Sequence, residues 1–200
     1  MISLYFGLPG CGKTTHAARM AYKAIRAGET VYTNIDSLNV SGVIHICNDD
    51  IGVYDISNGL LIIDEASLLA DNRDFKRRDD AYKHLIGWML LHRHYKVRIA
   101  MYVQQWDAID KRIRVITDRV YYVYRGKLFG RWLTRWYRVP YGIIIPKQDD
   151  SGPHLGDIVQ GYCRPRLLGR LFGGYMFRPR WYRYYDSWDA PLLPALPENR

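Results

Sequence analysis

The sequence predicts an α/β protein in which a parallel sheet is flanked by helices, and three observations support this fold class. Strand-like apolar runs alternate with helix-like stretches through the front part of the chain, which is the pattern of a parallel sheet covered by helices. A glycine-rich turn stands between the first apolar run and the first helical stretch. Of the 200 residues, 48% are hydrophobic and 24% are charged, a balance typical of a folded globular chain.

The expected strands and helices of the front part follow one another in alternation. Ile2–Phe6 predicts the first strand, and a helical stretch from Lys13 to about residue 27 ends at Gly28. The run at residues 60–63 is wholly apolar, which is typical of a strand buried on both faces. Further elements are expected as strands at Thr30–Thr33, 43–47 and Arg98–Val103 and as a helix over residues 80–95.

Charged residues are unevenly distributed along the chain. Of the net charge of +9, residues 1–110 carry −1, from 12 Lys/Arg and 13 Asp/Glu, whereas residues 111–200 carry +10, from 17 Lys/Arg and 7 Asp/Glu. Strand-like runs at residues 119–124 and 133–139 predict a β-hairpin in this basic part, and a polar loop follows at residues 148–155. We therefore expect an α/β domain over residues 1–147 and a small β-rich, basic extension with a Pro-rich tail over residues 148–200.

Cysteine usage and hydropathy indicate where the protein resides. The three cysteines are far apart and form no CxxC pair, so neither a disulfide framework nor a zinc site is indicated, and a reducing compartment fits best. No apolar run approaches the roughly 20 residues of a membrane helix, and no secretory leader is visible. The sequence predicts a cytoplasmic protein without a transmembrane segment.

The strongest motif is the segment GLPGCGKT at residues 7–14, which satisfies the phosphate-loop pattern G-x-x-x-x-G-K-[ST]. Glycines let backbone N–H groups surround a phosphate, and the following helix points its positive dipole end there. Lys13 is expected to contact the β- and γ-phosphates of ATP, and the Thr14 hydroxyl to bind Mg²⁺. The residues expected to hold the nucleotide are Gly7, Leu8, Pro9, Gly10, Cys11, Gly12, Lys13, Thr14 and Thr15.

Two further polar positions follow strands that are expected to end at the same sheet edge. Asp64 and Glu65 come directly after the apolar run at 60–63, so Asp64 is a candidate Mg²⁺ ligand and Glu65 a candidate general base for water. Gln104 follows the strand Arg98–Val103 and is a candidate to contact both the γ-phosphate and the attacking water, with Gln105 as its close competitor. The second acid, Glu65, favours hydrolysis of ATP over transfer of its phosphoryl group to a small-molecule substrate.

Several motifs succeed one another along the chain: the phosphate loop, Ile63-Asp64-Glu65, His92-Arg93-His94, Gln104 and Ile109-Asp110-Lys111-Arg112-Ile113-Arg114. Their succession resembles that of the zonula occludens toxin-like proteins, a family that includes the assembly and secretion ATPases of filamentous bacteriophages. The likeness covers residues 1–125, and the later Tyr184-Tyr185-Asp186-Ser187 is similar to the close of that family's cytoplasmic domain.

The resemblance implies a P-loop ATPase of the additional-strand type, related to DNA-pumping motors such as FtsK and HerA. It implies that Gln104 acts as a sensor, that subunits form a homo-oligomeric ring, and that ATP hydrolysis with Mg²⁺ powers virion assembly and export of single-stranded phage DNA. Many phage members continue into a transmembrane helix, whereas this chain ends at Arg200. A membrane-anchored phage assembly partner is therefore expected to recruit it peripherally to the host inner membrane.

Arg112 and Arg114 follow the Gln104 strand closely. In a ring, either guanidinium is a candidate to act across the subunit interface on the γ-phosphoryl group of a neighbour. The alternative is that both arginines pair with Asp110 or Asp118 of their own chain.

The basic rear part allows three interpretations. Arginines interleaved with Tyr and Trp suit single-stranded nucleic acid, in which phosphates meet guanidinium groups and bases stack on rings. The same composition suits an anionic membrane surface. A solvated face without a specific partner is the third.

Two other functions compete with a hydrolytic motor. A nucleoside or metabolite kinase is compatible with the length of the chain, although Asp64-Glu65 and Gln104 argue against it. A nucleotide-gated binding module with little turnover is the other.

Overall fold

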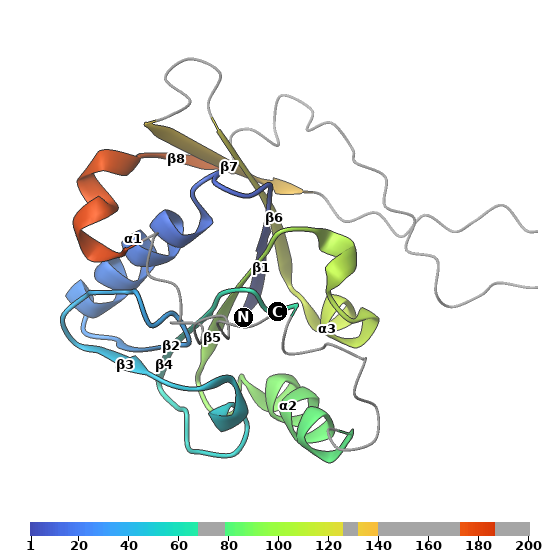
Figure 1. Cartoon of the computed structure of the whole chain (residues 1–200). Coiled ribbons are helices and arrows are strands. Elements are labelled where there is room, and N and C mark those ends of the chain that lie inside the picture. The colour runs from blue at the N-terminus through green and yellow to red at the C-terminus, as the bar shows by residue number, and fades with distance from the viewer. Residues whose placement is uncertain (68–78, 126–131, 140–172, 187–200) are drawn as a thin grey trace, which may run out of the picture.

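One mostly parallel sheet forms the centre of the molecule, with the strand order β3-β2-β4-β5-β1-β6-β7-β8 (Figure 1). The computed structural model describes residues 1–67, 79–125, 132–139 and 173–186. The parallel strands are β1 (Ile2–Phe6), β2 (Thr30–Thr33), β3 (Val43–His45), β4 (Gly59–Ile63), β5 (Arg98–Val103) and β6 (Arg119–Arg125). Strand β5 lies between β1 and β4. The predicted parallel α/β sheet is thereby confirmed.

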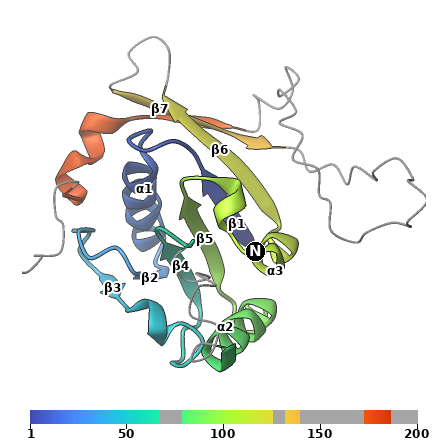
Figure 2. The same cartoon turned by 45° about the vertical axis from the view of Figure 1, so that its right-hand side comes forward.

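Helices cover both faces of this sheet (Figure 2). Helix α1 (Lys13–Arg26) packs on one face through small side chains at helical spacing, which let it approach the strands closely: Ala17, Ala18, Ala21 and Ala24. Helices α2 (Asp79–Leu91) and α3 (Lys111–Ile116) cover the opposite face, where their apolar residues include Met89 and Ile113. The two faces therefore have separate apolar cores. In the described parts of the chain, no helix is long and apolar enough to cross a membrane.

Two predicted elements end earlier than expected. The helix expected over residues 80–95 ends at Leu91, where the ring of His92 bonds the Met89 carbonyl at 2.7 Å and competes with helix continuation. Strand β3 ends at His45 rather than at residue 47. The chain there enters a short 3₁₀ turn, η1 (Asn48–Asp50), because the Asp50 carboxylate accepts the N–H of Cys47 at 2.7 Å.

The predicted hairpin is confirmed and has a third strand that the sequence did not indicate. Strand β7 (Leu133–Val139) pairs antiparallel with β6, and β8 (Gly174–Phe177) pairs antiparallel with β7. A Cβ atom at Gly174 would lie 2.3 Å from the Trp136 ring, so only glycine fits this position. The predicted loop at residues 148–155 and the tail at 190–200 lie outside the described residues.

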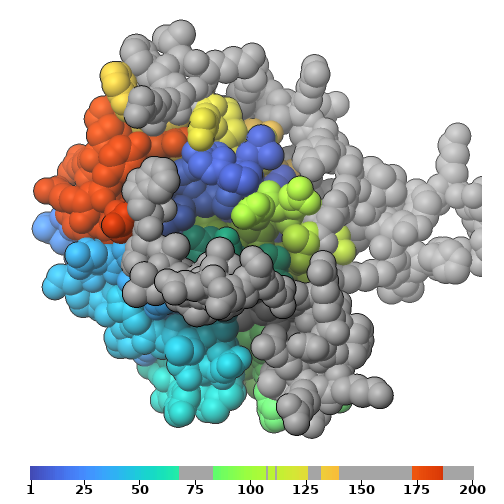
Figure 3. Space-filling view, viewed as in Figure 1, coloured from blue at the N-terminus to red at the C-terminus, as the bar shows by residue number. Residues whose placement is uncertain are grey.

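A 3₁₀ segment, η5 (Arg178–Tyr184), follows β8 and packs on α1 (Figure 1). Tyr22 of α1 contacts the rings of Trp181 and Tyr184, with centroids 5.6 and 5.2 Å away. In Figure 3 the orange surface of this segment lies directly against the blue surface of the N-terminal part. The C-terminal part thus reaches the helix that begins at the phosphate loop.

Candidate active site

The predicted phosphate loop connects β1 to α1. Gly10 and Gly12 have φ values of 67° and 98°, a region that favours glycine. The Lys13 ammonium folds back over the loop and donates to the carbonyls of Gly7 at 2.8 Å and Leu8 at 3.2 Å. Because these are neutral acceptors, the ammonium can exchange them for phosphate oxygens, to which charge-assisted hydrogen bonds are stronger.

Asp64 stands at the end of β4 and meets the start of α1. The Thr14 hydroxyl donates to Asp64 Oδ2 at 3.1 Å, so the two predicted Mg²⁺ ligands lie together. Burial raises the pKa of Asp64, and hydrogen bonds from the Glu65 N–H and the Thr14 hydroxyl oppose this rise by favouring the carboxylate. A hydroxyl and a carboxylate are hard oxygen donors of the kind that Mg²⁺ prefers, so these residues fit the ion.

Asn34, which the sequence analysis missed, holds the backbone of Asp64 in place. Its side-chain oxygen accepts the Asp64 N–H at 2.8 Å, and its NH₂ group donates to the Asp64 carbonyl at 3.0 Å. Asn34 directly follows β2, the strand beside β4. A polar residue immediately after a strand was the available signal, since it is the same signal that marked Asp64 and Gln104.

Glu65 and Gln104 are exposed at the same edge of the sheet. Glu65 has a φ of 48°, a conformation that costs a side chain such as glutamate about 1–3 kcal/mol and that clusters at functional sites. Gln104 is the first residue after β5, which separates β1 from β4, whereas Gln105 already begins the turn into η3 (Trp106–Ala108). The topology therefore favours Gln104 over Gln105 for contact with a γ-phosphate. The catalytic roles of Glu65 and Gln104 stay predictions.

The two candidate finger arginines lie on α3 beyond β5. Arg112 is exposed, and its Nε lies 3.6 Å from Asp110 Oδ1, as the intrachain alternative proposed. Arg114 is half-buried, with its guanidinium 5.8 Å from the centre of the Trp106 ring. Asp118, the other predicted partner, accepts from the Arg93 guanidinium at 2.9 Å.

A buried arginine from the rear part of the chain braces the phosphate loop. Arg178 is 7% exposed and donates to the carbonyls of Gly10 at 3.0 Å and Cys11 at 2.7 Å, and to the Thr134 hydroxyl at 2.6 Å. Thr134 in turn donates to the Cys11 carbonyl at 2.9 Å, and Arg125 donates to the Gly10 carbonyl at 3.0 Å. The prediction that the rear arginines face an external polyanion or solvent is wrong for Arg178.

The brace fixes the peptide groups of the loop. In a trans peptide the carbonyl and the next N–H lie in one plane and point in opposite directions. Holding the carbonyls of Gly10 and Cys11 therefore also sets the directions of the N–H groups of Cys11 and Gly12, away from the guanidinium. Such N–H groups are the phosphate ligands of a glycine-rich loop. Arg178 is accordingly a positioning residue of the loop.

Replacing Arg178 with alanine is expected to lower the free energy of unfolding by about 2–3 kcal/mol, because a buried set of charge-assisted hydrogen bonds is lost. ATP affinity should fall about tenfold, since the loop is no longer held in its binding conformation. Lysine at this position should restore little of the stability or the ATP affinity, because an ammonium lacks the planar, forked donor geometry with which a guanidinium reaches two carbonyls. Titration calorimetry and urea unfolding measure both effects, with exposed Arg180→Ala as the control. An unchanged ATP affinity in Arg178→Ala would contradict the role.

The residues after Thr14 in α1 make polar contacts toward opposite sides. The Thr15 hydroxyl lies 2.6 Å from the Tyr185 hydroxyl, just after η5. His16 Nδ1 lies 2.8 Å from the hydroxyl of buried Tyr102. Burial lowers the pKa of His16 to about 3, so the imidazole is neutral near pH 7.

A cavity of about 660 Å³ lies over the loop. Its walls are formed by Gly10, Gly12, Lys13, Thr14, Thr15, Arg178, Tyr182, Tyr185 and Asp186. This volume is within the range of small-molecule and cofactor sites. The glycine cradle, the lysine and the open cavity together fit a nucleoside triphosphate.

Fold and loop together define a P-loop NTPase. The sequence model of the zonular occludens toxin (Zot) family matches residues 41–149, more than half of the chain, and the protein belongs to this family. The match includes Asp64, Glu65, Gln104 and both candidate finger arginines, while the phosphate loop precedes it.

A solved structure of a zonular occludens toxin domain has the same fold. The N-terminal domain of zonular occludens toxin from Neisseria meningitidis is similar with a TM-score of 0.58 and 17% identity, over 92% of this chain and 98% of that one. The genome packaging NTPase B204 from Sulfolobus turreted icosahedral virus 2 gives a TM-score of 0.47 and 15% identity, over 69% and 92% of the two chains. No curated protein sequence matches the chain significantly.

Proposed function

We propose that the protein is an Mg²⁺-dependent ATP hydrolase that acts as a motor in virion assembly and export of single-stranded phage DNA. The observation that carries the hydrolase part is the 3.1 Å hydrogen bond between Thr14 and Asp64. Lys13 directly precedes Thr14 in the chain, and Glu65 directly follows Asp64. Membership of the Zot family and the resemblance to filamentous phage assembly ATPases support the motor part.

Each site residue has a distinct task in hydrolysis. Mg²⁺, when bound by Thr14 and Asp64, supplies positive charge that offsets the charge of the phosphate oxygens. Lys13 moves from the loop carbonyls to the phosphates and adds a second positive charge. Glu65 accepts the proton of the attacking water. Gln104 orients that water and contacts the γ-phosphoryl group.

Replacing Lys13 with alanine is expected to weaken ATP binding about tenfold or more, because a charge-assisted contact to phosphate disappears while the backbone cradle remains. Steady-state phosphate release should be lost in this variant, and in the wild type after chelation of Mg²⁺ by EDTA. Exposed Lys23→Ala, also in α1, is the matched control. Wild-type affinity of Lys13→Ala for ATP would refute the assignment of the loop.

The proposed DNA contact rests on exposed cations and rings around β7, β8 and η5. Arg135 of β7 stands opposite Tyr175 of β8, and both are exposed, as are Arg180 and Arg183. Guanidinium groups neutralise phosphates and release counterions, and exposed rings stack on bases. The membrane-surface interpretation uses the same groups and is tested by the same variants.

Replacing Arg135, Arg180 and Arg183 together with alanine is expected to weaken binding of single-stranded DNA and to reduce its salt dependence. Each lost phosphate contact should lower the slope of log K against log salt by about 0.7. Point variants are required because deletion of residues 151–200 would also remove β8 and Arg178. Fluorescence anisotropy with a labelled oligonucleotide measures the effect, alongside anionic vesicles and an Arg26→Ala control. An unchanged slope for DNA would exclude this surface.

A homo-oligomeric ring is part of the proposal, because a motor that pulls a polymer must hold it while single subunits exchange nucleotide. A membrane-anchored phage assembly partner is proposed to place the ring at the host inner membrane. Light scattering after size-exclusion chromatography, with and without ATP and DNA, tests the ring directly.

A further inference from the structure

The cavity over the phosphate loop extends beyond the residues that the loop itself requires. On one side its wall consists of Tyr182, Tyr185 and Asp186, which lie at the end of η5 or just after it. We propose that these residues form the nucleoside subsite, in which the base stacks on Tyr182 and the ribose hydroxyls donate to the Asp186 carboxylate. This inference rests on the proposed ATP-binding function.

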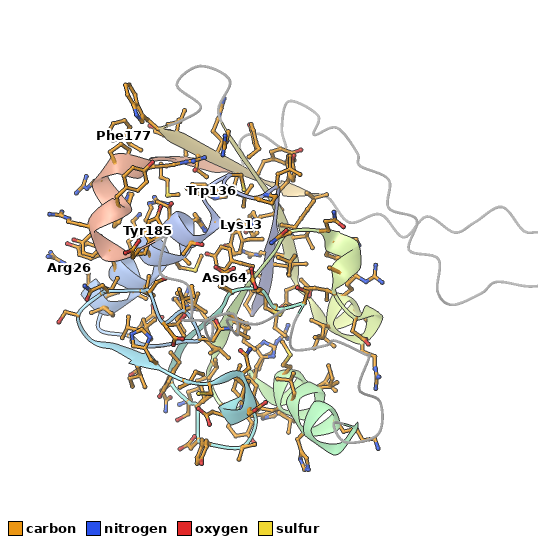
Figure 4. All side chains as sticks on the ribbon, in the orientation of Figure 1. Lys13, Arg26, Asp64, Trp136, Phe177 and Tyr185 are labelled. Carbon is orange, nitrogen blue, oxygen red and sulfur yellow. The ribbon has the colours of Figure 1, made fainter. Side chains whose placement is uncertain are left out.

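The two ends of the site give the bound nucleotide a direction. Thr14 contacts Asp64, whereas Thr15, the next residue of α1, contacts Tyr185. Consecutive side chains on a helix point about 100° apart. With the metal and the γ-phosphate at the Asp64 end, the proposal places the nucleoside toward Tyr185. Figure 4 shows Lys13 and Asp64 near the centre of the molecule and Tyr185 on the side of η5.

The side chains of this wall suit a nucleoside rather than phosphate. Tyr182 is 44% exposed, and its ring meets the Tyr185 ring edge-on, with centroids 6.2 Å apart. A base that covers the Tyr182 ring therefore buries aromatic surface. Asp186 is exposed and acidic, which repels phosphate groups and favours the hydroxyl donors of ribose.

The wall is attached to the segment between β2 and β3 as well as to Thr15. The backbone of Tyr184 accepts the N–H of Asn39 at 2.8 Å, and Tyr185 forms a β-bridge with Leu38. The N–H of Asp186 donates to the carbonyl of Ser37 at 3.2 Å. The segment after β2 therefore holds the subsite in place before a nucleotide arrives.

Binding of ADP and of pyrophosphate by the full chain separates the two halves of the site, because both ligands carry a diphosphate and neither is hydrolysed at the γ-position. Titration calorimetry with Mg²⁺ is expected to show ADP at least about tenfold tighter than pyrophosphate, given the usual strength of base–aromatic stacking. Tyr182→Ala should bind ADP about tenfold more weakly than the wild type and should bind pyrophosphate with unchanged affinity. Tyr182→Phe should bind both ligands like the wild type, as should Tyr54→Ala, which removes an exposed ring that does not line the cavity.

The ribose contact has its own test. Dideoxy-ADP, which lacks both ribose hydroxyls, is expected to bind the wild type more weakly than ADP, and this difference should vanish in Asp186→Ala. Equal wild-type affinities for ADP and pyrophosphate would overturn the nucleoside subsite, whatever the variants do. An equal loss of affinity for ADP and for pyrophosphate in Tyr182→Ala would overturn the nucleoside subsite as well. Failure of the wild type to bind either ligand would instead refute the ATP-binding function.

Discussion

Replacing Glu65 with glutamine is expected to lower ATP turnover by about 10²–10⁴-fold, the usual contribution of a general base. ATP and Mg²⁺ should remain bound, because Lys13, Thr14 and Asp64 are untouched. The glutamine keeps the size of the side chain and faces the same backbone cost at a φ of 48°, so the change isolates the carboxylate. Single-turnover kinetics and an equilibrium titration with ATP measure the two quantities separately.

Asp64→Asn is the matched control for this variant. It removes the neighbouring carboxylate and is expected to weaken the response to Mg²⁺, whereas Glu65→Gln should leave the Mg²⁺ concentration for half-maximal ATP binding unchanged. Turnover of Glu65→Gln within a few-fold of the wild type would remove Glu65 from the role of general base.

Loss of an arginine finger has the second large expected effect, about 10³–10⁵-fold in rate where such a residue acts on the γ-phosphoryl group. We expect Arg112→Ala or Arg114→Ala to lose turnover while retaining ATP binding, because each variant keeps its own phosphate loop. The two candidate arginines differ in exposure and in their contacts. Arg112 is exposed, with its Nε 3.6 Å from Asp110 Oδ1, whereas Arg114 is half-buried against Trp106.

Mixing inactive subunits decides whether the finger acts across an interface. A Lys13→Ala subunit lacks a working site but keeps its arginines, and an arginine variant keeps its site but lacks the finger. Co-assembly of the two should restore part of the ATPase activity. A mixture that stays inactive despite proven co-assembly would rule out action in trans. Arg93→Ala, which loses the ion pair with Asp118, is the control expected to keep turnover.

Local patterns were sufficient to predict the parallel sheet and the phosphate loop. Strand β1, helix α1 and the loop between them are encoded by neighbouring residues: an apolar run, glycines that adopt positive φ, and small side chains at helical spacing. The placement of Asp64 beside Thr14 followed from the rule that parallel strands end at one edge. Boundaries such as the end of α2 were predicted less well, because a single side-chain bond from His92 decided them.

The sequence by itself determined that this protein is a P-loop α/β protein and that Asp64 stands near its phosphate loop, since those features depend on local patterns and on the shared edge at which parallel strands end. Only the tertiary structure decided that Arg178 braces the loop from 167 positions away and that Tyr185 bonds Thr15 from 170 positions away. Nothing local distinguishes Arg178 from exposed Arg180 two residues later. The difference arises because β8 joins the sheet beside β7, which turns one guanidinium inward onto buried carbonyls and leaves the other in solvent.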